Sequence, residues 1–90
     1  MITEIIKDSL KENLKELGIN VLTDQISLER PANRDHGDWS SNIALVTAKN
    51  AGRQARELAE EIVNSLIADL PNGVTEVTVA GPGFINFRIS

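Results

Sequence analysis

The sequence predicts an α+β fold, a small antiparallel β-sheet with about three α-helices packed on one face. Residues 2–17 and 54–69 carry apolar side chains at helical spacing. Residues 74–79 and 84–89 are rich in β-branched or aromatic residues and alternate in polarity, as strands do. The Gly-Pro-Gly turn at 81–83 is short enough to join these two strands as an antiparallel hairpin. Helices and strands that follow one another in this order are typical of the α+β class.

The N-terminal part is predicted to form one helix and one short strand. Over residues 2–17, isoleucines and leucines fall in one apolar arc, and opposite charges lie three residues apart on the other side. Gly18 is a natural end for this helix. Residues 25–30 alternate in polarity, which predicts a short strand, and Pro31 prevents its continuation as a central strand.

Two further helices are expected in the middle of the chain. Asp38 is a good N-cap for a helix over residues 39–50, and Gly37 before it supplies backbone freedom that other residues lack. The helix over residues 54–69 has the strongest amphipathic pattern in the chain. Pro71 to Gly73 form the turn that follows it.

Composition limits the classes of function. The chain has 90 residues, which is enough for one domain with one compact core. It has no cysteine, and its N-terminus mixes charged with apolar residues, so we expect no disulfide, signal peptide, membrane span or membrane partner and a cytoplasmic location. The net charge of −4 argues against general nucleic-acid binding. Residues 30–56 nevertheless hold five basic against two acidic residues, which suits either a local RNA contact or an ordinary solvated surface.

One polar loop collects the residues that a hydrolase would need, namely Asp35, His36, Asp38, Ser40 and Ser41. Serine-type catalysis needs a nucleophile, a base and an acid that converge from different elements, and neighbours in one loop seldom do so. A metal site would need a second histidine or a cysteine. The Gly-Pro-Gly segment is followed by a strand, so it is no phosphate-binding loop. The sequence therefore predicts no catalytic residue, metal or cofactor in this chain.

The last strand raises the main question about function. Its isoleucines and Phe87 face the core, whereas Phe84, Asn86 and Arg88 share the opposite face. Phe84 is either covered by a neighbouring helix or second domain, or it is a platform on which an unpaired base stacks beside an amide and a guanidinium. Trp39 is expected to lie in the core.

The order of motifs resembles the N-terminal domain of arginyl-tRNA synthetases over nearly the whole chain. The closing run GPGFINF, residues 81–87, matches that family almost letter for letter. A second series in the family combines a proline, an asparagine, a His-Gly-Asp-aromatic motif and an Ala-Lys end. Its positions here are Pro31, Asn33, His36, Gly37, Asp38, Trp39, Asn42, Ala44, Leu45, Ala48 and Lys49. The family commonly has tyrosine at the position of Trp39 and often proline at that of Ala55.

The resemblance implies an appended domain that docks on the D-loop at the outer corner of an arginine-accepting tRNA. Phe84 and Asn86 occupy the positions that offer an aromatic ring and an amide to an exposed base. Arg88 on the same face and Arg34 in the basic segment complete the predicted RNA-binding set. Some relatives have an amide residue where this chain has Ala80, which removes part of that base recognition.

The resemblance also implies a longer parent enzyme. We expect residues 1–90 to form a single, monomeric N-terminal domain whose other partner is the catalytic domain of the same chain. That domain would use ATP with Mg²⁺ to join arginine to its tRNA, and its two ATP-site motifs are absent here. A stand-alone protein-interaction module that uses the hairpin face is the alternative, and a small hydrolase comes third.

Overall fold

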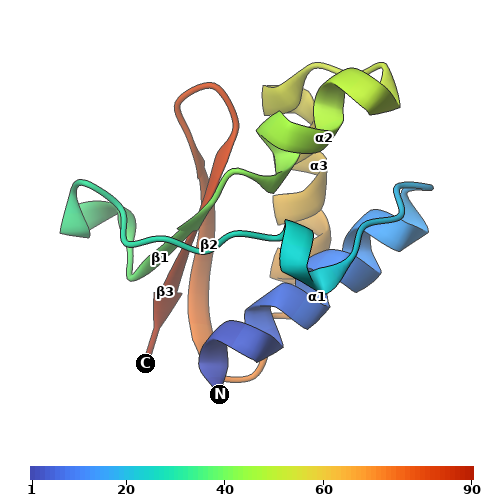
Figure 1. The fold of residues 1–90 in the computed structure, drawn as a ribbon. Helices are drawn as coiled ribbons and strands as arrows, with labels where there is room; N and C mark the ends of the chain where they lie inside the picture. The colour runs from blue at the N-terminus through green and yellow to red at the C-terminus, as the bar shows by residue number, and fades with distance from the viewer.

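The computed structural model describes all 90 residues, and it confirms the predicted α+β class (Figure 1). The three strands form an antiparallel sheet in the order β1-β3-β2, so the closing strand β3 lies in the centre. The three α-helices lie together on one side of this sheet. In chain order the elements are α1 (Ile2–Glu16), the 3₁₀ turns η1 (Thr23–Gln25) and η2 (Arg34–His36), β1 (Trp39–Ser41), α2 (Ile43–Ala51), α3 (Ala55–Ala68), β2 (Val74–Ala80) and β3 (Phe84–Ile89).

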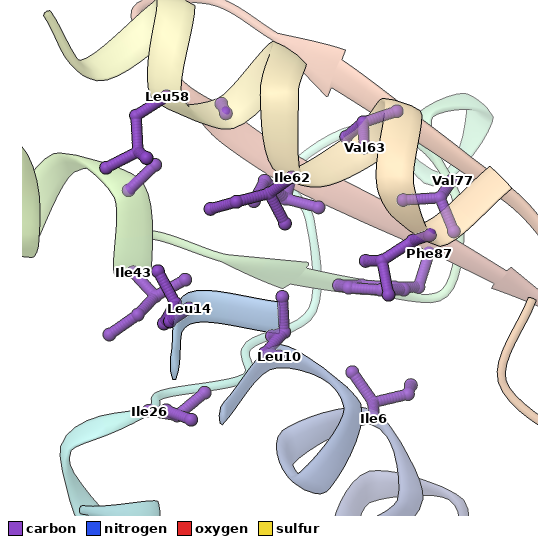
Figure 2. Close-up of a cluster of buried hydrophobic side chains, with 14 of the residues drawn as sticks. Ile6, Leu10, Leu14, Ile26, Ile43, Leu58, Ile62, Val63, Val77 and Phe87 are labelled. Atoms are coloured by element: carbon purple, nitrogen blue, oxygen red, sulfur yellow. The ribbon is translucent and has the colours of Figure 1, made fainter. Parts of the chain in front are cut away.

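A single hydrophobic core fills the space between the helices and the sheet. Leu10 of α1 and Ile62 of α3 are fully buried and point toward Phe87, which is the largest fully buried side chain and belongs to the central strand (Figure 2). Burial of each such side chain contributes about 1.5–3 kcal/mol. The core therefore fixes β3 from the helix side and leaves its other face for the residues that alternate with Phe87.

The hairpin between β2 and β3 is confirmed, and α3 holds its turn. Gly81 and Gly83 both have positive φ, +57° and +144°. A Cβ atom on Gly83 would lie 3.0 Å from the backbone of Ala55, so the turn packs closely against the first residue of α3. Arg56, one residue further along, donates a hydrogen bond of 2.6 Å to the carbonyl of Gly81.

The predicted strand over residues 25–30 is wrong. The backbone N–H of Leu22 donates to the side chain of Gln25 at 2.7 Å, which favours the 3₁₀ turn η1 at this point. Only Glu29 pairs with the sheet, through an isolated antiparallel bridge to Ser40. Because Pro31 follows two residues later without a backbone donor, the pairing does not extend.

The predicted start of the second helix at residue 39 is also wrong. Residues 39–41 form β1, which pairs with β3, and the helix begins at Ile43. Asp38 does not cap a helix. Its backbone N–H donates to the carbonyl of Phe87 at 2.7 Å, and its carboxylate accepts from the N–H of Ile89 at 2.8 Å. Asp38 thus joins β1 to the end of β3, and the Ser41 hydroxyl accepts the 3.2 Å bond from the first N–H of the helix.

Gly37 is needed where the loop meets β3. Its φ of +124° and ψ of −163° lie in a region that glycine alone populates readily. A Cβ atom there would lie 2.7 Å from the carbonyl oxygen of Phe87. The sequence prediction of unusual backbone freedom at this position is therefore confirmed.

No helix combines the length and the apolar character that crossing a lipid bilayer requires.

Candidate nucleic-acid interface

A cavity of about 500 Å³ lies between the hairpin turn and the loop of residues 27–36. The end of this loop that carries η2 lies on the side of the sheet away from the helices (Figure 1). Phe84 is the only phenylalanine, tyrosine or tryptophan in the lining, and seven of the other twelve lining residues are polar or charged. The lining residues are Ser27, Glu29, Arg30, Pro31, Ala32, His36, Ser40, Asn42, Ala80, Gly81, Pro82, Phe84 and Asn86.

Phe84 lines this cavity with a partly exposed ring. It is the first residue of β3, and it pairs with Ala80 across the hairpin. The residue is 40% exposed, so its ring is only partly covered by the rest of the chain. An exposed aromatic ring on a face that alternates away from the core is available for stacking.

Asn86 lies deeper than alternation alone suggests. It sits on the central strand between Ser40 of β1 and Thr78 of β2, and it is only 3% exposed. Its Oδ1 atom is buried without a hydrogen-bond partner. A buried carbonyl oxygen without a partner costs about 1–3 kcal/mol, so this lining amide has unused hydrogen-bonding capacity.

The two predicted arginines lie outside the cavity lining. Arg88 donates to the Glu76 carboxylate at 3.4 Å and to the backbone carbonyl of Asp35 at 2.7 Å, so it ties η2 to the sheet. Arg34 is exposed on η2 and forms no ion pair. The structure therefore brings Phe84 and Asn86 together in the cavity lining and places Arg34 and Arg88 outside it.

Arg30 is a lining residue that the sequence prediction missed. Its guanidinium lies over the Trp39 ring at 4.0 Å from the centroid, and its Nη1 donates to the carbonyl of Asp38 at 3.0 Å. Trp39 itself is half-buried and packs against the core. The prediction that it lies in the core is therefore confirmed only in part. The basic bias of residues 30–56 was the only sequence signal for Arg30, because its place depends on how the loop folds over the sheet.

Two of the hydrolase-like residues of this loop have structural roles. Asp38 accepts from the N–H of Ile89, and Ser41, which is 1% exposed, accepts from the N–H of Ile43. No three His, Asp or Glu side chains are grouped so as to hold a metal ion. These bonds give the Asp38 carboxylate and the Ser41 hydroxyl structural roles.

Comparison with known proteins identifies the domain. The family model described as the arginyl tRNA synthetase N terminal domain matches residues 4–89. The chain belongs to this family. The resemblance noted in the sequence is thereby confirmed.

Relatives and a solved structure agree with this assignment. The chain is 43% identical over 88 residues to the arginine–tRNA ligase of Paenarthrobacter aurescens (strain TC1) and 40% identical over 88 residues to that of Pseudarthrobacter chlorophenolicus; each match covers 98% of the chain. The solved arginyl-tRNA synthetase of Thermus thermophilus matches the whole chain with a TM-score of 0.82 and 26% identity, covering 14% of that structure. The chain spans 16% of the length of each curated relative.

Proposed function

We propose that the chain is the N-terminal domain of an arginine–tRNA ligase and docks on the D-loop of arginine-accepting tRNA. The observation that carries the proposal is the partly exposed Phe84 ring in the same cavity as the Asn86 amide. The family supports a synthetase as the parent protein. The volume of the cavity supports a single unpaired nucleotide as the ligand, since it lies within the range of small-ligand pockets.

Each side chain has a distinct part in this proposal. The Phe84 ring stacks on the base, which contributes about 1–3 kcal/mol for any base. The Asn86 amide hydrogen-bonds to a base edge and so selects among bases. Arg34 offers an unpaired charge to a nearby phosphate. Arg88 holds the η2 loop against the sheet, and the exposed side of its guanidinium faces the RNA.

The chemistry belongs to another part of the parent enzyme. The relatives are arginine–tRNA ligases about six times as long as this chain, as its 16% share of their length implies. In our proposal a separate catalytic domain binds ATP with Mg²⁺ and joins arginine to the tRNA. The N-terminal domain, acting as one monomeric unit in the cytoplasm, raises the affinity for the tRNA and takes no part in the reaction itself.

Steady-state kinetics of the full ligase test the proposal. Phe84→Ala should lower kcat/KM for tRNA by about 5- to 150-fold, the equivalent of one stacking contact, and leave the KM values for ATP and arginine unchanged. Ile67→Ala is the matched control, because Ile67 is 56% exposed on α3 and lies outside the cavity. A Phe84→Ala enzyme with an unchanged melting temperature and wild-type tRNA kinetics would refute the proposal and favour a protein partner for the hairpin face.

A further inference from the structure

Arg30 is the one arginine in the cavity lining, and its charge has no carboxylate partner. Arg53, Arg56 and Arg88 each form an ion pair with a glutamate. Arg30 forms none, although the chain carries an excess of negative charge. The Arg30 guanidinium therefore lines the cavity without an ion-pair partner.

The guanidinium of Arg30 is also held in a fixed position. Its Cζ lies over the Trp39 ring, 4.0 Å from the ring centroid, and one of its nitrogens donates to the Asp38 carbonyl. Asp38 and Trp39 are fixed in turn by their bonds and pairing to β3. Stacking on an aromatic ring orients the planar fork of an arginine, so that little side-chain freedom is lost when it binds a ligand.

The remaining donors of Arg30 suit an anion. A guanidinium has five N–H donors, and Arg30 uses one nitrogen for Asp38. Arginine forks match the geometry of phosphate oxygens and bind them in a bidentate way. Glu29 also lines the cavity, so an anion is favoured only at the guanidinium itself.

We propose that Arg30 binds the backbone phosphate of the nucleotide whose base stacks on Phe84. This inference rests on the proposed function, because it assigns a second residue of the same cavity to the same RNA. Phe84 and Arg30 line one cavity of about 500 Å³, so a base and its phosphate can reach both. The Trp39 ring acts as a positioning residue that keeps the guanidinium in place.

The dependence of tRNA binding on salt separates a phosphate contact from a stacking contact. Each phosphate contact with a single strand contributes about 0.7 to the slope of log K against log salt. Over a fourfold rise from 50 to 200 mM salt, the effect of losing one contact should therefore shrink by a factor of about 2.6. Loss of a stacking contact should weaken tRNA binding by the same factor at both salt concentrations.

The experiment compares Arg30→Gln with Phe84→Ala in the full ligase, with a transcript of arginine-accepting tRNA as the probe. Arg30→Gln should raise the KM for tRNA by about tenfold at 50 mM salt and about fourfold at 200 mM, with the KM for ATP unchanged. Phe84→Ala should show one salt-independent factor. Arg53→Gln is the matched control, because it removes an ion-paired arginine outside the cavity and should leave both values at wild type.

A conservative variant guards against loss of folding. Arg30→Lys keeps the charge and loses the planar fork, so it should retain the wild-type salt slope with a KM raised by about threefold. Suppose that Phe84→Ala weakens binding. The phosphate assignment then fails if Arg30→Gln matches wild type, if the Arg30→Gln effect is equal at both salt concentrations, or if Arg30→Lys loses the wild-type salt slope. If Phe84→Ala has no effect, the proposed function itself fails.

Discussion

Substitution of Gly37 by alanine should destabilise the domain far more than the addition of one methyl group suggests. The backbone at Gly37, φ +124° and ψ −163°, costs about 1–3 kcal/mol for a residue with a Cβ atom. The new Cβ would also lie 2.7 Å from the carbonyl oxygen of Phe87. To relieve that contact, the loop must move away from β3 and weaken the Asp38 N–H bond to Phe87, a further loss of about 1 kcal/mol.

The sum is about 3 kcal/mol, which corresponds to a fall in melting temperature of about 12–24 °C for a domain of this size. Thermal unfolding followed by circular dichroism, with Trp39 fluorescence as a second probe, measures it. Gly52→Ala is the matched control, since Gly52 has φ +67° and no atom within 4 Å of the added Cβ. It should cost only about 1–2 kcal/mol. If Gly37→Ala melts no lower than Gly52→Ala, the close approach of the loop to β3 does not require glycine at position 37.

Two further substitutions test how the site is held in place. Asp38→Ala should lower the free energy of unfolding by about 1–2 kcal/mol and speed hydrogen exchange at the Ile89 amide, because that amide loses its acceptor. Faster exchange in the first turn of α2 instead would restore the helix-cap interpretation. Arg56→Gln should loosen the hairpin turn and speed exchange at the Gly83 amide, whereas Arg53→Gln should leave it unchanged. Equal exchange in the two variants would show that Arg56 does not hold the turn.

The elements at the two ends of the chain could be predicted from the sequence because their signals are local. The helical pattern over residues 2–17 gave a helix at Ile2–Glu16, and that over 54–69 gave one at Ala55–Ala68. The hairpin was equally clear, since its strands flank a Gly-Pro-Gly turn. Each of these elements is encoded by residues near one another in the chain.

The middle of the chain could not be predicted in the same way. Trp39–Ser41 is a strand because it pairs with Ile85–Phe87, more than forty residues later in the sequence. A three-residue strand is too short to show a period. Asp38 has the residue type of a helix cap, but its carboxylate is used by the distant Ile89. Long-range pairing decided both outcomes.

The candidate site was predicted in part. Alternation along β3 placed Phe84 and Asn86 on the face away from the core, and both line the cavity. The burial of Asn86 and the presence of Arg30 depend on the loop that folds over the sheet, which alternation cannot describe. Whether Phe84, Asn86, Arg88 and Arg34 bind RNA stays a prediction.

A photocrosslink from position 84 tests the central claim most directly. In the full ligase, Phe84 is replaced by the photoreactive aromatic residue benzoylphenylalanine, and the crosslinked nucleotide of bound arginine-accepting tRNA is mapped by primer extension. The same residue at position 67, exposed on α3 away from the cavity, is the control. We predict a crosslink to one nucleotide of the D-loop from position 84 and none from position 67. A crosslink from position 84 to another part of the tRNA, or no crosslink at all, would contradict the proposal that this cavity receives a D-loop base.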